Sequence, residues 1–462
     1  MSEFNYDLIV IGAGPGGYVS AIRASQLGMN VAVIEKDNPG GVCLNWGCIP
    51  SKSLISQAQK FTYLKDLENM GIKTDASGFN YESVYKKSRL AAAKLSKGVE
   101  FLLKKNKIEL IKGAAKISGN NTITVDGDKQ YTANKILIAT GSRPRIIPGF
   151  EFDEAGVLSS TGALNLKTLP KSVAIIGAGA IGVEFAYIFN SFGVKVHLVE
   201  MLDSILPLED KDASDILAKA FKKNSVKIYT SVKASISEKM SSGYKVKLEA
   251  DGEPEFIDVE KILVAVGRTP NSDNLGLENL GIKTDRGFIE TGDFYETSVP
   301  GIYAIGDVIN TPLLAHVASK EGEIAVEHMA GKGHEKRVDP TLIPGAVYTE
   351  PQIASFGYTE MKAHEAGFPV KVFSFPFRGA GKAVAVEESD GFVKLVCHEE
   401  THEILGAHIV GKEATELIHE ILLARKSELL PEDIAAMIHA HPTLSEAVME
   451  AARGIEEWAI HV

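Results

Sequence analysis

The chain has 462 residues, too many for one hydrophobic core, so about three domains of roughly 150 residues each are expected. Hydrophobic residues at 45% and charged residues at 24% are typical of a folded protein and exclude a disordered chain. The formal net charge of −11 leaves no broad positive field for a polyanion, so a nucleic-acid partner is not expected.

The N-terminal segment gives no sign of export. Residues 1–7 carry acidic side chains and lead directly into the apolar run at residues 8–12, without a basic leader or a cleavage signal. The longest apolar runs are well short of the roughly 20 residues that span a bilayer. We therefore expect a cytoplasmic protein with no membrane partner. In that reducing compartment, three cysteines are too few for a disulfide framework.

An internal repeat is the strongest organisational signal. Residues 7–36 (DLIVIGAGPGGYVSAIRASQLGMNVAVIEK) match residues 172–201 (SVAIIGAGAIGVEFAYIFNSFGVKVHLVEM). Each copy has an apolar run, a glycine turn, helix-like apolar spacing and a second apolar run, which together predict a βαβ unit. The predicted fold is α/β, with two Rossmann-like dinucleotide-binding domains and a C-terminal α+β domain that forms an oligomer interface.

The first copy carries the turn Gly12-x-Gly14-x-x-Gly17, and Glu35 ends its second strand. The glycines allow a tight turn and a close approach of the backbone to a pyrophosphate, which then lies on the helix N-terminus. Glu35 can accept hydrogen bonds from ribose hydroxyls. A glycine-rich turn alone can be purely structural, but this order of strand, helix and acid favours a dinucleotide site.

The second copy repeats these features with Gly177, Gly179, Gly182 and Glu200. The 2′-phosphate of NADP needs cationic partners near the end of the second strand. Glu200 is followed by Met-Leu-Asp, however, and residues 146–267 contain no arginine. The second nucleotide is therefore predicted to be NAD.

Two cysteines lie just after the first copy, in GGVCLNWGCIPSK at residues 40–52. Four residues separate Cys43 from Cys48 and can form a loop that brings the sulfurs to bonding distance. Pro50 suits the first turn of a helix that begins just after Cys48, and its N-terminus would stabilise a thiolate. A metal site is the alternative, but it needs further ligands, and Cys397 is isolated. We prefer a redox-active pair and expect Cys397 to be a buried structural thiol.

The first domain extends to residue 143, because a lysine-rich amphipathic stretch (81–107) and strand-like alternation (108–131) continue it. The next segment, RPRIIPGF (143–150), is predicted to be a connection, since two prolines and a glycine interrupt regular structure. The second domain is placed at 144–270.

A central segment covers residues 271–343 and contains GIYAIGDV (301–308), a predicted buried strand that ends at a turn. The last unit is residues 344–462. Near its end, HAHPTLSE (439–446) offers His441 and Glu446 as a candidate acid–base pair for deprotonating a thiol. Glu446 would orient the imidazole. A histidine before proline is otherwise commonly a turn residue, and His439 is expected to be structural.

With these motifs the sequence resembles the class I flavoprotein disulfide reductases, and within them the branch that oxidises dihydrolipoamide. The resemblance covers essentially the whole chain, and CLNWGCIPSK is its most specific motif. Val42 and Trp46 stand where Thr and Val are expected, but both are apolar neighbours that leave the sulfur chemistry undisturbed. The resemblance implies FAD bound by residues 1–143 and completed by 271–343, and NAD bound by residues 144–270.

The resemblance also implies individual roles. Cys48 would face the flavin, which stacks between the disulfide and the nicotinamide, and form the charge-transfer thiolate, while Cys43 exchanges with the substrate sulfur. Lys52 would lie near the reactive flavin nitrogen and pair with Glu184, and Asp307 would bond the ribityl chain. The alternatives are a solvated Lys52, a Glu184 that complements a helix dipole, and an Asp307 that caps a helix. Ala115 and Ala315 are expected to offer backbone contacts to FAD, and Gly267 is placed among the cofactor-binding residues.

The implied activity is oxidation of protein-bound dihydrolipoamide to lipoamide with NAD⁺. An obligate homodimer follows, in which one subunit supplies His441 and Glu446 to the disulfide of the other. The implied partner is the lipoyl-bearing acyltransferase subunit of 2-oxo acid dehydrogenase complexes. One alternative is a reductase of another disulfide, such as glutathione, and the lack of arginine after Glu200 argues against its NADPH-using forms. The other is an assembly subunit in which Cys43, Cys48 and His441 are dispensable.

Overall fold

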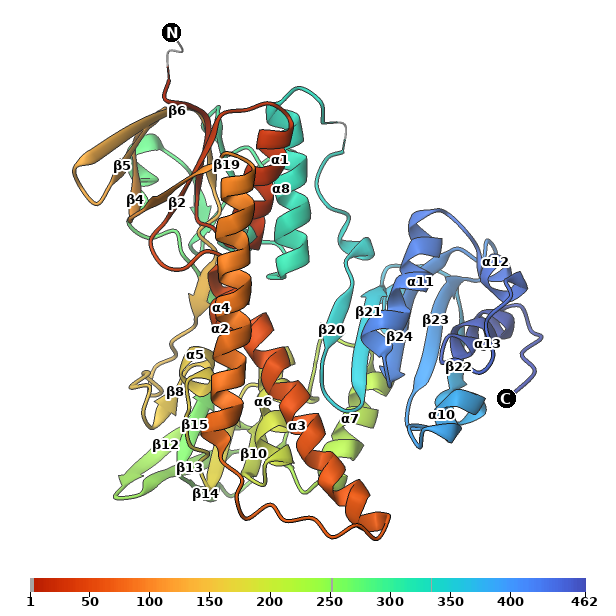
Figure 1. The fold of residues 1–462 in the computed structure, drawn as a ribbon. Helices are drawn as coiled ribbons and strands as arrows, with labels where there is room; N and C mark the ends of the chain where they lie inside the picture. The colour runs from red at the N-terminus through yellow and green to blue at the C-terminus, as the bar shows by residue number, and fades with distance from the viewer. Residues whose placement is uncertain (1–3, 251, 334) are drawn as a thin grey trace.

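The computed structural model describes residues 4–250, 252–333 and 335–462, so residues 1–3 of the N-terminal segment discussed above lie outside it. Figure 1 shows three sheet-containing regions, with the N-terminal one at the top, the middle of the chain below it and the C-terminal one at the side. Among the described residues, no helix combines the length and the apolar character that crossing a membrane requires.

The first repeat forms the predicted βαβ unit: β1 (Tyr6–Ile11), α1 (Pro15–Gln26) and β2 (Val31–Glu35). β1 pairs in parallel with β2 and with β6, and its apolar run is buried, as is usual for a central parallel strand. β19 pairs in parallel with β6, although it comes much later in the chain. The other strands of this seven-stranded sheet are β3 (Glu109–Lys112), β4 (Ala115–Gly119), β5 (Thr122–Val125), β6 (Lys129–Ile138) and β19 (Ile302–Ala304).

The second repeat forms the same unit, with β9 (Ser172–Ile176), α6 (Ala180–Ser191) and β10 (Lys195–Val199). The two-domain α/β prediction is therefore confirmed. The five-stranded sheet is completed by β8 (Val157–Leu158), β11 (Lys227–Tyr229) and β15 (Lys261–Val264). A three-stranded antiparallel sheet lies beside it, formed by β12 (Lys233–Met240), β13 (Gly243–Glu249) and β14 (Glu255–Val259).

Two short strands connect these sheets. β7 (Ser142–Pro144) leaves the first region and pairs antiparallel with β16 (Arg268–Pro270), which returns to it. The prediction that residues 143–150 lack regular structure is therefore wrong at their start. The reason is that the pairing partner lies more than 120 residues away, where no local pattern reveals it.

Three helices lie between the first and second sheets: α2 (Gly41–Trp46), α3 (Cys48–Asn69) and α4 (Tyr81–Lys105). α3 packs against α4 and α6, so it joins the two dinucleotide-binding regions (Figure 1). The cysteines were expected to flank a loop, but Cys43 lies in α2 and only Gly47 interrupts the helical path to Cys48. A Cβ at Gly47 would be 3.1 Å from the carbonyl oxygen of Val42, a tight contact that favours glycine at this break.

The C-terminal unit is an antiparallel sheet with helices on it, which confirms the predicted α+β class. Cys397 is fully buried in β23, and burial raises its pKa to about 12, as expected of a structural thiol. The strands are β20 (Gly345–Val347), β21 (Gln352–Gly357), β22 (Val370–Pro376), β23 (Phe392–His398) and β24 (Ile404–Gly411). The helices are α9 (Glu360–Glu365), α10 (Gly381–Ala385), α11 (Ala414–Lys426), α12 (Pro431–Ala436) and α13 (Glu446–Ile455).

Candidate active site

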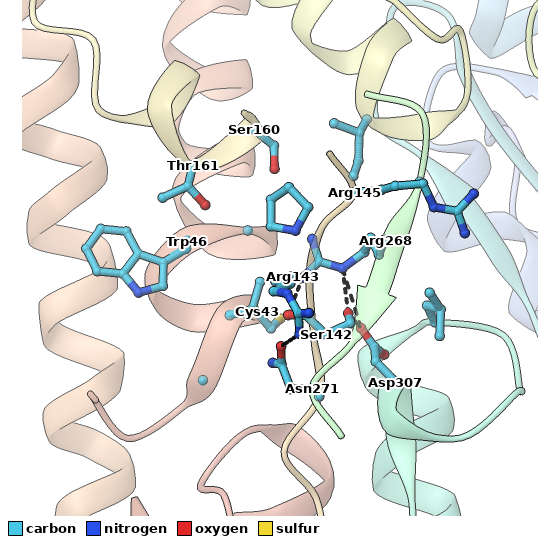
Figure 2. Close-up of a pocket in the computed structure, with 18 of the residues that line it drawn as sticks. Cys43, Trp46, Ser142, Arg143, Arg145, Ser160, Thr161, Arg268, Asn271 and Asp307 are labelled. Atoms are coloured by element: carbon cyan, nitrogen blue, oxygen red, sulfur yellow. Dashed lines mark hydrogen bonds and ion pairs between the residues drawn. The ribbon is translucent and has the colours of Figure 1, made fainter. Parts of the chain in front are cut away.

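One cavity of about 1840 Å³ runs from the first glycine turn to the second. Pockets for a single small ligand usually measure roughly 300–1,000 Å³, so this one has room for two dinucleotides. The cysteine pair and Lys52 line its middle, and Figure 2 shows Cys43 there, below Trp46 and Thr161. Ala115, Gly267, Asp307 and Ala315 also line the wall, the last at the start of α8 (Ala315–Met329).

The first and third glycines of each turn are required by the fold. A Cβ on Gly17 would lie 1.9 Å from the oxygen of Gly12, and a Cβ on Gly182 would lie 1.9 Å from the oxygen of Gly177. The close packing of helix on strand therefore excludes any side chain at the third position. Gly12 and Gly177 also have φ values of +105° and +99°, which only glycine adopts without strain.

The middle glycines behave differently. A Cβ on Gly179 would meet no atom within 4 Å, and a Cβ on Gly14 would meet only the Cα of Gly41, at 4.0 Å. Both positions line the cavity at a helix N-terminus. The missing side chains leave open the space in which a pyrophosphate would approach the backbone.

The two acidic residues are held in the same way in both copies. Oε2 of Glu35 accepts a hydrogen bond from the backbone N of Ala13 at 2.7 Å, and Oε2 of Glu200 accepts one from Ala178 at the same distance. The other oxygens accept from Asp37 and Leu202. Each carboxylate is thus fixed against its glycine turn and lines the cavity, with lone pairs left for ribose hydroxyls.

Asp307 belongs to a network that spans three segments of the chain. Its Oδ2 accepts a hydrogen bond from Ser142 Oγ at 2.5 Å, and Arg268 Nε donates to that same Oγ at 2.7 Å (Figure 2). Burial lowers the pKa of Arg268, while the charge of Asp307, 3.7 Å away, opposes this effect. Ser142 and Arg268 were not predicted as site residues, because they meet only when β7 pairs with β16.

Both active-site cysteines are free thiols, and they form a hydrogen bond with each other. The bond from Cys43 lowers the pKa of Cys48 to about 7, with help from the charge of Lys52 and the start of α3, while burial opposes the shift. The same bond, together with burial, raises the pKa of Cys43. The pair therefore holds its thiolate on Cys48 and its proton on Cys43.

Lys52 and Glu184 form an ion pair between α3 and α6. Nζ of Lys52 lies 3.0 Å from each carboxylate oxygen of Glu184 and 4.4 Å from the ring centre of Tyr348. The backbone N of Tyr348 also donates to Glu184, at 3.2 Å. Residues of all three regions therefore fix the Lys52 ammonium beside the cysteines.

Lys52 and Glu184 carry opposite charges near Cys48, so removing one or the other should shift the pKa of Cys48 in opposite directions. In the reduced protein, we expect Lys52→Met to raise the pKa of Cys48 by about one unit, and Glu184→Gln to lower it by less. The pH dependence of alkylation measures this, because Cys48 reacts as the thiolate while the raised pKa of Cys43 keeps that group silent. Lys65→Met, on the exposed part of α3, is the matched control. Equal midpoints in all four proteins would contradict the electrostatic coupling.

His441 and Glu446 form the predicted pair, with Nδ1 of His441 2.9 Å from Oε1 of Glu446. Burial would raise the pKa of Glu446, but the hydrogen bond from Thr443 N and the contact with His441 lower it overall. The His441 side chain is 76% exposed. Glu446 begins α13, which lies far from α2 in Figure 1, and neither residue of the pair lines the cavity. One chain therefore does not bring the pair to the cysteines.

His439 is the buried histidine of this segment. Its side chain is 3% exposed, and its Nε2 lies 2.8 Å from Glu420. It therefore has the structural environment that the sequence predicted. Within residues 4–250, 252–333 and 335–462, no group of three or more His, Cys, Asp or Glu side chains is arranged to hold a metal ion.

Comparisons with known proteins agree with this geometry. Residues 6–322 match the family described as pyridine nucleotide-disulphide oxidoreductase, and residues 343–452 match its dimerisation domain. The chain is 46% identical to a dihydrolipoyl dehydrogenase of Geobacillus stearothermophilus, over 99% of this chain and 97% of that protein. It is also 46% identical to a dihydrolipoyl dehydrogenase of Corynebacterium glutamicum, over 98% of each chain.

Two solved structures have the same fold. LpdA from Mycobacterium tuberculosis superposes with a TM-score of 0.90 at 28% identity, covering 97% of this chain and 99% of that one. The HOCl-induced flavoprotein disulfide reductase RclA from Escherichia coli gives a TM-score of 0.86 at 28% identity, with the same coverage. The likeness extends over all three sheet-containing regions.

Proposed function

Since the chain belongs to the pyridine nucleotide-disulphide oxidoreductase family, we propose that it is a dihydrolipoyl dehydrogenase, which uses FAD and NAD⁺ to oxidise protein-bound dihydrolipoamide to lipoamide. The observation that carries the proposal is the single cavity that joins two dinucleotide turns across a cysteine pair. Such a cavity lets electrons pass from a dithiol to a pyridine nucleotide inside one protein.

The residues of each half fit a dinucleotide. In the first half, the open space at Gly14, the carboxylate of Glu35 and the turn at Asp307 would hold FAD, with Ala115 and Ala315 in its wall. In the second half, Gly179, Glu200 and Gly267 would hold NAD⁺. When bound, FAD takes the electron pair of the cysteine dithiol and passes it on to NAD⁺ as a hydride.

The cysteines carry out the thiol chemistry. In the disulfide form, a deprotonated substrate thiol attacks Sγ of Cys43, breaks the Cys43–Cys48 bond and leaves Cys48 as a thiolate. The second substrate thiol then displaces Cys43, so the substrate leaves as a disulfide and the protein keeps a dithiol with the electron pair. The low pKa of Cys48 makes it the better leaving group, which supports attack at Cys43.

Lys52 and Glu184 act on the electrostatics of this dithiol. The ammonium of Lys52 stabilises the Cys48 thiolate, and Glu184 restrains the ammonium from α6, close to where the nicotinamide would enter. Removing either charge changes the pKa of Cys48 without replacing a cysteine. The pair therefore links the cysteine site to the NAD half of the cavity.

His441 and Glu446 would deprotonate the substrate thiol from the second subunit of a homodimer. Exposed apolar side chains occur in the chain segments just before the pair and just after α13, which supports a protein interface there, and Ile438 is 96% exposed. The others are Met437, Trp458, Ile460 and Val462. In this arrangement the exposed imidazole of one subunit would complete the cysteine site of its partner.

The proposed physiological partner is the lipoyl-bearing acyltransferase subunit of a 2-oxo acid dehydrogenase complex. Its reduced lipoyl group is a dihydrolipoyl dithiol, the substrate in the relatives' name. The cytoplasmic location expected from the N-terminal sequence stays a prediction. So do the boundaries 1–143, 144–270, 271–343 and 344–462.

The test is NADH formation by the purified, FAD-loaded protein with dihydrolipoamide and NAD⁺, beside a parallel sample with NADP⁺. We expect rapid turnover with NAD⁺ and little with NADP⁺, since Glu200 favours a ribose hydroxyl over a phosphate. A protein that binds flavin but forms no NADH from dihydrolipoamide would contradict the proposed substrate. Glutathione disulfide and other disulfides with NADH would then be the next substrates to assay.

A further inference from the structure

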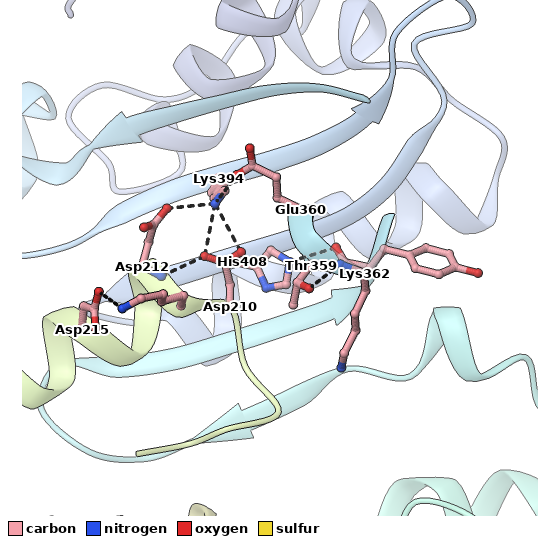
Figure 3. Close-up of polar contacts among 10 residues, drawn as sticks. Asp210, Asp212, Asp215, Thr359, Glu360, Lys362, Lys394 and His408 are labelled. Atoms are coloured by element: carbon pink, nitrogen blue, oxygen red, sulfur yellow. Dashed lines mark hydrogen bonds and ion pairs between the residues drawn. The ribbon is translucent and has the colours of Figure 1, made fainter. Parts of the chain in front are cut away.

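A buried lysine joins the C-terminal sheet to the NAD-binding region. Lys394 lies in β23, where its side chain is 5% exposed, and its Nζ contacts three carboxylates (Figure 3). The distances are 3.2 Å to Asp210, 2.8 Å to Asp212 and 2.9 Å to Glu360. We call these four residues the Lys394 cluster. Asp210 and Asp212 come from the start of α7 (Lys211–Lys223), so the cluster crosses between two regions of the fold.

The surroundings keep this cluster charged. Burial alone would lower the pKa of Lys394, but the hydrogen bonds to Asp212 and Glu360 and the charge of Asp210 raise it overall. His408 is buried beside the cluster, and its Nε2 donates to the carbonyl oxygen of Tyr358 at 3.0 Å. Burial lowers the pKa of His408, which disfavours a second positive charge beside Lys394. A buried charge with three partners fixes the position of each partner more firmly than a surface pair does.

A short path leads from the cluster to the glycine turn of the NAD site. Asp210 caps α7, accepting a hydrogen bond from the backbone N of Asp212. One turn further on, Ser214 Oγ donates to the carbonyl oxygen of Leu206 at 3.2 Å. The backbone N of Leu206 in turn donates to the oxygen of Ala178, at 2.9 Å. Ala178 directly follows Gly177, and its backbone N donates to Glu200. The path therefore ends in the glycine turn that would hold the pyrophosphate.

The segment on this path is also a wall of the cavity. Met201, Leu202, Pro207 and Leu208 line the NAD half, between the end of β10 and the cap of α7. The segment itself has no regular secondary structure, and the side chain of Leu208 is largely exposed. Its middle is anchored by the buried side chains of Ile205 and Leu206 and by the hydrogen bond from Leu206 to Ala178, and its two ends are held from outside the segment. Glu200 holds one end, and the Lys394 cluster holds the other.

We propose that Lys394 is a positioning residue for NAD⁺, through which the dimerisation domain holds residues 201–210 against the nucleotide. The inference rests on the proposed function, since it takes the second glycine turn to be the NAD⁺ site. Lys394 touches neither nucleotide nor substrate. Its loss releases the wall of the NAD half and leaves the cysteine site unchanged.

Three variants of the FAD-loaded dimer test this role. Lys394→Met removes the charge at similar length. Asp210→Asn removes the buried carboxylate of the link to α7 while retaining an oxygen for the cap, and it leaves Lys394 paired with the exposed Asp212 and with Glu360. Lys211→Met is the matched control, because this lysine is exposed on the same helix and its ion pair is with Asp215 within α7. The readouts are the Kd of NAD⁺ by calorimetry, KM for NAD⁺ against kcat, and the rate of protein reduction by dihydrolipoamide without NAD⁺.

We expect Lys394→Met to weaken NAD⁺ binding about tenfold and Asp210→Asn to weaken it severalfold. The rate of reduction by dihydrolipoamide should stay unchanged in both, and Lys211→Met should match the wild type in every readout. Unchanged NAD⁺ affinity in Asp210→Asn overturns the proposal, whether or not Lys394→Met folds. A wild-type protein that binds no NAD⁺ would instead refute the proposed function, so the two failures are distinguishable.

Discussion

Replacing Cys48 by serine reduces NADH formation from dihydrolipoamide by a factor on the order of 10³ or more, because a serine hydroxyl can neither form the disulfide nor leave as a thiolate. Cys43→Ser has the same effect on turnover, since it removes the sulfur that the substrate attacks. Both variants keep FAD, because neither side chain supports the first glycine turn. The measurement is steady-state NADH formation, together with the flavin spectrum of each protein.

Cys397→Ser is the matched control for this experiment. Cys397 is buried in β23, away from the cavity-lining residues, so its replacement costs about 1–3 kcal/mol of stability and leaves turnover near that of the wild type. Wild-type turnover by Cys48→Ser would refute the thiol mechanism. It would also leave the assembly-subunit alternative as the better account of the chain.

Replacing His441 by glutamine lowers turnover with dihydrolipoamide about 10²- to 10⁴-fold, since the substrate thiol then lacks its base. Glu446→Gln has a smaller effect, because it retains a hydrogen bond to the imidazole but loses the charge that stabilises the cation. His439→Gln serves as the control. It removes a buried contact with Glu420 and leaves the pair intact. Equal losses in His439→Gln and His441→Gln would show that the segment matters only for folding.

Mixing inactive proteins tests whether the pair acts across the dimer. A Cys48→Ser chain still has an intact His441, and a His441→Gln chain still has intact cysteines. If each site combines the cysteines of one subunit with the histidine of the other, a mixed dimer has one intact site. Unfolding and refolding the two variants together then restores about a quarter of the wild-type activity, since half of the dimers are mixed and each has one of two sites. No recovery, in mixed dimers verified by mass, would place the pair and the cysteines in one chain.

Local pattern was enough to predict the two βαβ units. Gly17 and Gly182 have their roles in the backbone of a single turn, where a side chain would lie 1.9 Å from the oxygen of Gly12 or of Gly177. The apolar runs on either side are buried in parallel strands, whose continuous hydrophobicity is visible in the sequence. Features of this kind depend on neighbours in the chain, so they can be recognised without the fold.

The short helix α2 was not predicted, because its stability depends on residues outside the local pattern. A six-residue helix is unstable alone, and this one depends on contacts from outside. The side chain of Asn45 donates to the oxygens of Pro39 and Gly41, and Arg89 of α4 donates to the oxygen of Asn45. Only the last of these partners is distant in sequence, but it is the one that closes the end of the helix.

One feature of the sequence indicates the Lys394 cluster. Lys394 stands inside FVKLVCH, where almost every neighbour is buried, and a lysine in such a strand needs a carboxylate partner. The partners themselves are more than 180 residues away in Asp210 and Asp212, so the sequence could not name them. The same limit applied to Ser142 and Arg268, which only the pairing of β7 with β16 brings together.

That pairing also bears on the ancestry of the fold. The chain leaves the first sheet after β6 and returns to it before β19, and the two crossing points are adjacent, since Asn271 N donates to Gly141 O at 2.8 Å. A segment whose two ends meet can be inserted into a host domain without separating the host's strands. Insertion of a copied nucleotide-binding unit into the original would leave two similar repeats in this arrangement. The host sheet would stay intact around a junction that is only two strands wide.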